Sequence, residues 1–103
     1  MKFGLSKEEL TLLEKLVVAP LVEQGATVWI FGSRARGDYN RYSDIDILFR
    51  CDDQKALPPG FLYDVKTNIE EARIPFKVDL VNERDLAETY RQSVEKEKIV
   101  FSK

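Results

Sequence analysis

Three aspartates are the residues of this sequence whose type and spacing are best suited to chemistry. Asp44 and Asp46 form an Asp-x-Asp pattern at the start of an apolar segment, and Asp79 lies between apolar residues of a later segment. Residues two apart in a strand point to the same face, about 6.5 to 7 Å from each other. If both segments are neighbouring strands, the three carboxylates converge on one face of a sheet.

Convergent carboxylates indicate a divalent cation. Like charges about 4 to 5 Å apart repel by roughly 3 to 4 kcal/mol at an effective dielectric near 20, and a cation turns that repulsion into binding energy. Carboxylate oxygens with open coordination positions suit Mg²⁺, or Mn²⁺ in its place. Asp44 and Asp46 can both reach a pair of cations roughly 3.5 to 4 Å apart. We therefore expect a site for two metal ions.

A glycine and a serine directly follow the apolar segment 26–31, and ten residues separate Ser33 from Asp44. Gly32 lets the backbone approach a ligand closely. Ser33 adds a hydroxyl and an amide at the start of a predicted helical turn, where N–H groups attract phosphate. Together with the acidic residues, this pattern favours a nucleoside triphosphate complexed with Mg²⁺.

The composition excludes several other kinds of site. The chain has 103 residues, of which 44% are hydrophobic and 33% charged, which is typical of one folded domain over residues 1–103. It contains no histidine, so Ser-His-Asp triads, Cys-His pairs and His-ligated zinc are excluded. A formal charge of −2 disfavours direct DNA binding. The single cysteine and the lack of a long apolar run predict a cytoplasmic protein without a membrane span.

Hydrophobic spacing predicts which elements position these residues. A capping box at Ser6 begins a helix that ends near Gly25, and Pro20 inside it predicts a kink or break near residue 19. Asn82 is the predicted N-cap of the last helix, with Leu86, Tyr90 and Val94 on one side. The other predicted elements are strands at 26–31, 45–50 and 76–81, one helical turn at 33–36, a helix at 60–72, and an unassigned short element at 99–101. The order αβαβαβα predicts an α+β fold with a small mixed three-stranded sheet flanked by helices.

Three segments together resemble the signature of the minimal nucleotidyltransferases, which are small members of the DNA polymerase β-like superfamily. These are 28–37 (VWIFGSRARG), 43–47 (SDIDI) and 77–81 (KVDLV). The resemblance covers nearly the whole chain and implies the palm-like nucleotidyltransferase fold. It also implies transfer of AMP from ATP to a hydroxyl group, with pyrophosphate leaving.

The same resemblance implies a biological role and a partner. In this family the protein is commonly the antitoxin of a small helical HEPN toxin, which it adenylylates on a tyrosine, so a hetero-oligomer is expected. Two other functions stay open. The chain could be an inactive or weakly active nucleotide-binding module that neutralises its partner by stoichiometric binding, or it could transfer to a small molecule.

Residue roles follow from the matching positions. The resemblance implies that Asp44 and Asp46 bind both metal ions, and that Asp79 holds the catalytic metal and helps to deprotonate the attacking hydroxyl. Gly32 and Ser33 would position the β and γ phosphates.

The basic residues of the motif are less clearly assigned. Arg34 and Arg36 could both offer charge to phosphate, but Arg36 could equally pair with Asp38 or a loop carbonyl. Tyr39 and Tyr42 could stack on a base, contact the partner or pack within the loop. The tail at 97–99 lacks the glycine that the family resemblance leads us to expect before the last apolar element.

Overall fold

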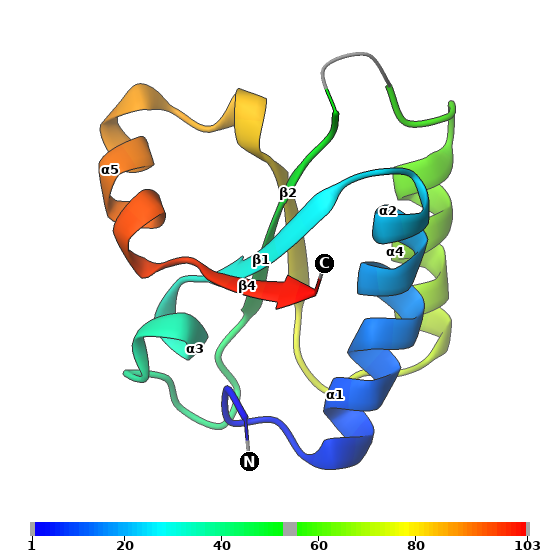
Figure 1. The fold of residues 1–103 in the computed structure, drawn as a ribbon. Coiled ribbons are helices and arrows are strands. Elements are labelled where there is room, and N and C mark those ends of the chain that lie inside the picture. Colours follow the sequence, from blue (N-terminus) through cyan, green and yellow to red (C-terminus); the bar gives the residue numbers. More distant parts are fainter. Residues whose placement is uncertain (1, 53–55, 103) are drawn as a thin grey trace.

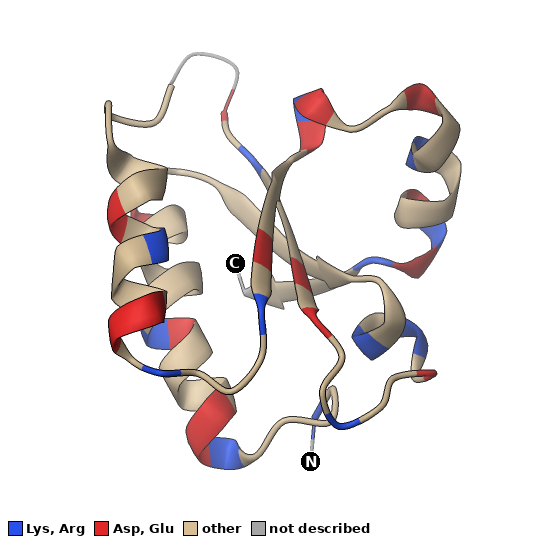
Figure 2. Cartoon of the chain, turned by 180° about the vertical axis from the view of Figure 1, so that it is seen from behind, with Lys and Arg blue, Asp and Glu red and all other residues tan. Residues whose placement is uncertain are grey.

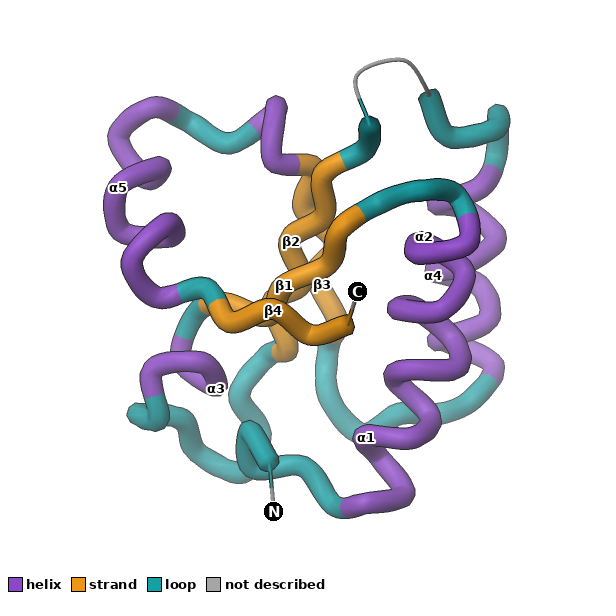
Figure 3. Tube along the Cα trace, in the orientation of Figure 1, coloured by secondary structure: helices purple, strands orange, loops and turns teal. Residues whose placement is uncertain are grey.

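The computed structural model describes residues 2–52 and 56–102 (Figure 1). Its elements alternate between helix and strand, as the sequence predicts (Figure 3). They are α1 (Lys7–Leu13), a π-helical segment η1 (Glu14–Val18), α2 (Ala19–Glu23), β1 (Thr27–Phe31), α3 (Ser33–Arg36), β2 (Ile45–Arg50), α4 (Phe61–Glu71), β3 (Val78–Asn82), a 3₁₀ turn η2 (Glu83–Asp85), α5 (Glu88–Glu97) and β4 (Ile99–Ser102). The predicted α+β class is confirmed.

The described strands form one mixed four-stranded sheet in the order β3-β2-β1-β4. β1 is antiparallel to β2 and to β4, whereas β2 and β3 are parallel. The sequence predicts three strands, and the fourth, β4, is the short element at 99–101 that the sequence pattern does not assign. Its apolar segment is too short for periodicity to identify a strand, and pairing with β1 supplies its hydrogen bonds.

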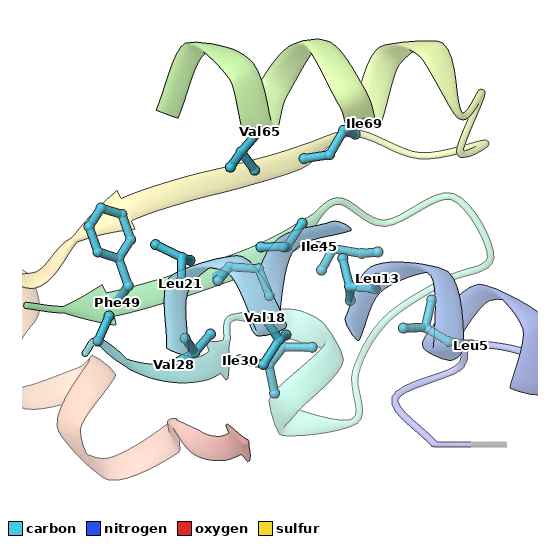
Figure 4. Packing of buried hydrophobic residues seen from close by; sticks show 13 residues of the cluster. Leu5, Leu13, Val18, Leu21, Val28, Ile30, Ile45, Phe49, Val65 and Ile69 are labelled. Atoms are coloured by element: carbon cyan, nitrogen blue, oxygen red, sulfur yellow. The ribbon is translucent and has the colours of Figure 1, made fainter. Parts of the chain in front are cut away.

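Each face of the sheet packs against different helices. The larger core lies between the sheet and the helices α1, η1, α2 and α4, as Figure 4 shows for Val28, Ile45 and Phe49. On the opposite face, a smaller cluster joins Trp29 and Leu48 of the sheet to Val94 of α5. Among the described helices, none combines the length and the apolar character that crossing a bilayer requires. Asp46, two residues before Leu48 in β2, points to the face that α5 covers.

The first helical region accommodates Pro20 by a change of helix type. The predicted capping box is present, with Ser6 Oγ accepting from the Glu9 N–H at 3.1 Å and Glu9 Oε1 accepting from the Ser6 N–H at 2.8 Å. Instead of a break near residue 19, the chain forms π-helical turns over Glu14–Val18 and then continues as α2. Pro20 cannot donate to a carbonyl four residues earlier, and the wider turns before it accommodate its ring.

The predicted start of the last helix is wrong. Asn82 Oδ1 accepts from the Arg84 N–H at 3.2 Å and so caps η2, while α5 begins only at Glu88. The intervening Leu86 is extended, with φ −72° and ψ 128°, which separates the two helical segments. Leu86, Tyr90 and Val94 nevertheless lie on one side, as predicted, and line one cavity, although Tyr90 is 63% exposed.

The chain enters β4 without the glycine expected there. Lys98 has φ −63° and ψ 141°, an extended conformation that any residue adopts. The missing glycine at 97–99 therefore does not prevent the formation of β4.

The irregular connection between α3 and β2 is held by a buried guanidinium. Arg34 is 2% exposed and donates to three carbonyl oxygens, those of Ser43 at 3.0 Å, Phe3 at 2.9 Å and Arg41 at 3.2 Å. Its carbon Cζ also lies 4.6 Å from the centre of the Phe76 ring. Only a planar fork of donors serves partners in these directions at once.

We expect Arg34→Lys to destabilise the protein, because a single ammonium leaves buried carbonyls without donors. The free energy of unfolding should fall by about 2 to 4 kcal/mol. Urea unfolding measures the change, and Arg84→Lys, an exposed position, is the control with an expected change below about 0.5 kcal/mol. Equal stability of the two variants would contradict this role for Arg34.

Candidate functional site

The parallel pairing of β2 and β3 places two of the predicted aspartates side by side. Asp46 and Asp79 are register partners, and Ile45 and Ile47 on either side of Asp46 are buried in the core beneath. Side chains at paired positions of neighbouring strands share a face, and the strands lie about 4.8 Å apart. Figure 2 shows acidic segments next to each other on the two strands.

The third aspartate lies at the entrance of β2. Asp44 is exposed and precedes the strand by one residue. Its charge acts on Asp46, as described below, but within residues 2–52 and 56–102 no three acidic or thiol side chains lie close enough to hold one ion. The structure thus pairs Asp46 with Asp79 and leaves Asp44 beside them without a closed three-carboxylate cluster.

Asp46 has the most perturbed carboxyl group of the site. Its partial burial is the largest cause, with the neighbouring charges of Asp79 and Asp44 next, of a rise in its pKa to about 6. Arg36 lowers this pKa, while Glu97 adds to the increase. The nearby positive groups of the protein compensate the negative charge of Asp46 only in part. A bound cation would supply the missing positive charge, so Asp46 is suited to be a cation ligand.

Gly32 makes room for this carboxylate. It has φ 79° and ψ −159°, a conformation that favours glycine, and a Cβ atom added here would collide with Asp46 Oδ2. The backbone of the turn therefore crosses directly over the carboxylate at the end of β1. Only glycine permits this approach.

A cavity of about 550 Å³ opens beside this crossing, between the ends of β1 and β2 and the inner side of α5. Asp44, Asp46, Gly32, Ser33 and Arg36 are the predicted site residues that line it. The remaining lining residues are Phe31, Ser43, Leu86, Tyr90, Ser93, Val94 and Glu97. The cavity thus has an acidic and hydroxyl-bearing floor and a partly apolar wall.

Two predicted site residues lie outside this lining. Asp79, on the edge strand β3, is part of the wall of a second cavity of about 380 Å³ between β3 and α4, and its Oδ1 lies 3.4 Å from Lys77 Nζ. Arg34 is buried beneath the loop, as described above. The geometry brings Asp79 next to Asp46 but does not bring Arg34 to the cavity.

Arg36 has the ion pair that was one of its two predicted roles. Its Nε lies 3.1 Å from Asp38 Oδ2 and its Nη1 lies 3.0 Å from Glu97 Oε2. Hydrogen bonds to Asp38 and then to Glu97 raise the pKa of this guanidinium. Arg36 also lines the cavity, so the pairing leaves it near a bound ligand.

Sequence reasoning missed the contribution of α5 to the site. Tyr90, Ser93, Val94 and Glu97 recur at three- and four-residue spacing, so they share the helix side that faces the cavity. The signal was available, because Ser93 and Glu97 are polar residues on the same side as the buried Val94. It could not be interpreted without knowing which part of the sheet α5 covers.

The donors present fit a hard divalent cation. They are carboxylate oxygens, they are crowded enough to raise the pKa of Asp46, and the Asp46 carboxylate lies against Gly32, where a larger residue would not fit. The hydroxyl of Ser33 lies in the same cavity. This arrangement can hold a metal-complexed anion at the end of β1.

Sequence comparison identifies the relatives of this chain. The family described as polymerase beta, nucleotidyltransferase matches residues 21–103. The protein named "Probable protein adenylyltransferase MntA" of Haemophilus influenzae (strain ATCC 51907 / DSM 11121 / KW20 / Rd) is 31% identical over 102 residues, which are 97% of this chain and 84% of that protein.

Solved structures share the fold. A structure described as a candidate minimal nucleotidyltransferase is 31% identical with a TM-score of 0.62, over 92% of this chain and 95% of its own. A toxin-antitoxin structure with AMP-PNP is 24% identical with a TM-score of 0.64, over 86% of this chain and 72% of its own, and shows similarity of fold alone. With the family match over most of its length, this chain belongs to the polymerase β-type nucleotidyltransferases.

Proposed function

We propose that this chain is a Mg²⁺-dependent protein adenylyltransferase that moves AMP from ATP onto a tyrosine hydroxyl of a HEPN-type toxin and thereby acts as its antitoxin. The observation that carries the proposal is the pair of register-matched carboxylates, Asp46 and Asp79, beside the crossing at Gly32. Like charges this close repel each other in the absence of a cation, and a bound cation would relieve that repulsion.

The comparisons support the reaction class and the role. The Haemophilus influenzae relative is named a probable protein adenylyltransferase. A structure with the same fold is of a toxin-antitoxin with AMP-PNP, a triphosphate analogue. The tyrosine acceptor and the HEPN partner rest on the family resemblance of the motifs.

In this proposal Asp44, Asp46 and Asp79 hold two Mg²⁺ ions, with Mn²⁺ as a substitute. When bound, the cations supply charge neutralisation and activation of the acceptor hydroxyl. The hydroxyl oxygen of the acceptor forms a bond to the α-phosphorus. At the same time the bond from that phosphorus to the oxygen bridging the α and β phosphates breaks, and pyrophosphate leaves with the electron pair of the broken bond. Asp79 takes up the hydroxyl proton.

The residues of the turn and of α5 bind the nucleotide. Ser33 donates its hydroxyl to the phosphates, Gly32 lets them approach the backbone, and Arg36 contributes positive charge. Leu86 and Val94 offer an apolar wall to the nucleoside. Arg34 does not contact the phosphates in this proposal, because its Nε, Nη1 and Nη2 each donate to a backbone carbonyl.

A second function has one observation in its favour. Among the described residues no three acidic side chains are gathered tightly enough to hold one ion. A chain that binds nucleotide without transferring it, and neutralises its partner by stoichiometric occlusion, would need no such cluster.

Incubation with ATP labelled in its α-phosphate, Mg²⁺ and the protein encoded next to this chain separates the two functions. We expect label on a tyrosine of the neighbour together with loss of its toxicity. Neutralisation of the neighbour without label would support occlusion and contradict adenylyl transfer.

Replacing the carboxylates tests their roles one by one. Asp44→Asn, Asp46→Asn and Asp79→Asn should each reduce the rate of transfer by about 100-fold or more, because each removes a charged ligand of the cations. The initial rate of label transfer is the measurement, and Asp64→Asn, an exposed aspartate of α4, is the matched control. Full activity of the Asp79 variant would exclude it from the reaction.

The stability of Asp46→Asn in metal-free protein should depend on pH. The pKa of Asp46 is raised from 3.8 to about 6 in the folded protein. Its contribution to the free energy of unfolding is therefore fully present below pH 3.8, where it is protonated, and is lost as pH rises through about 6. The asparagine variant should therefore match the wild type near pH 4 and exceed its free energy of unfolding by about 1 kcal/mol near pH 8, a figure reduced for partial exposure. Urea unfolding across this range measures the difference, and a large loss of stability at every pH would mean that Asp46 is structural.

A further inference from the structure

The last residue of α5 reaches back to the turn after β1. Glu97 uses its two carboxylate oxygens separately, with Oε1 accepting from the Gly32 N–H at 3.1 Å and Oε2 accepting from Arg36 Nη1 at 3.0 Å. The Arg36 side chain is 45% exposed, so the second contact is open to solvent, whereas the Glu97 side chain is 15% exposed, which partly shields the first contact from water. Charge-assisted hydrogen bonds in such surroundings are stronger than exposed ones.

These contacts are not part of the hydrogen bonding of helices or of the sheet. Gly32 follows the last paired residue of β1, Phe31, so its N–H has no partner in the sheet and takes the side chain of Glu97 instead. The orientation of this peptide determines how the next residue, Ser33, faces the cavity. Glu97 thus acts on a residue of the proposed phosphate site through the backbone.

The second contact orients a guanidinium. Arg36 is held from two sides, by Asp38 at Nε and by Glu97 at Nη1. Its Nη2 has no hydrogen bond to any residue that the structure describes. Two carboxylates therefore fix the plane of the guanidinium at the cavity and leave a donor for a ligand.

We propose that Glu97 is a positioning residue for triphosphate binding, acting through the Gly32 amide and the Arg36 guanidinium. The proposal rests on the proposed function, since it concerns the same nucleotide site. Glu97 touches neither phosphate nor metal in this role. Its own charge is matched by Arg36, and its contacts preserve the shape of the turn and the direction of the free donor.

A different role for Glu97 predicts the opposite change in triphosphate affinity when Glu97 is removed. A carboxylate on these two donors could occupy the place of a phosphate and compete with it. Removing a competitor strengthens binding, whereas removing a positioning residue weakens it. The affinity for a triphosphate therefore distinguishes the two roles directly.

Equilibrium binding of a non-hydrolysable ATP analogue with Mg²⁺, and of adenosine without phosphates, tests the proposal. Glu97→Ala should weaken binding of the analogue about 10-fold or more, as expected for loss of a charge-assisted contact. Glu97→Gln keeps an acceptor for the Gly32 N–H but not the charge opposite Arg36, so a smaller loss is expected. Affinity for adenosine should not change in either variant.

A double-mutant cycle with Arg36→Ala shows whether Glu97 acts through the guanidinium. The loss caused by Glu97→Ala should be clearly smaller in the Arg36→Ala background than in the wild type. Glu88→Gln, at an exposed glutamate of the same helix, is the control and should leave both affinities unchanged. Thermal unfolding checks that each variant is folded, and the near-isosteric Glu97→Gln carries the test if the alanine variant is not.

Three results would overturn the proposal: tighter binding of the analogue after loss of Glu97, unchanged binding, or strictly additive effects with Arg36→Ala. An equal loss of adenosine affinity would also overturn it, because a general structural role would explain that result. If the wild-type chain binds no analogue at all, the proposed function fails with it. If the wild type binds and the Glu97 variants bind equally well, only the role of Glu97 fails.

Discussion

The parallel register between β2 and β3 is the constraint on which the site depends. It sets Asp46 beside Asp79, although their charges repel each other. The register is held from the opposite face, where Ile45 and Ile47 are buried in the larger core. Slipping the strand by one residue would expose these side chains and bury the aspartates, so apolar packing on one face maintains charge crowding on the other.

Two sets of long-range polar contacts hold the segments next to Asp46 and Asp79 in place. Arg34 binds carbonyls of the loop that leads to Asp44, and Glu97 binds the turn at Gly32. Both are charged side chains that bond to backbone groups without a partner in helix or sheet, and Glu97 also binds the Arg36 guanidinium. The segments that carry chemistry are irregular, and these contacts give them defined positions.

Much of the fold was predictable because local patterns agreed with the final packing. The capping box at Ser6, the β-branched strand before Gly32 and the alternation around Asp46 all formed as predicted. The errors occurred where tertiary contacts decided the outcome. β4 is a strand because β1 offers it an edge, and α5 starts late because Leu86 packs against the sheet in an extended conformation.

The sequence by itself determined the chemical groups of the site: a trio of aspartates, a Gly-Ser turn at a strand end, and the absence of histidine. Only the tertiary structure decided which arginine is buried and which lines the cavity, since Arg34 and Arg36 stand two residues apart in the same motif. It alone brought in Glu97, which lies 65 residues from its partner Gly32. Residue type and spacing determine which groups are available along one element, but the burial of a charge and the choice of its partner depend on which other elements pack against it.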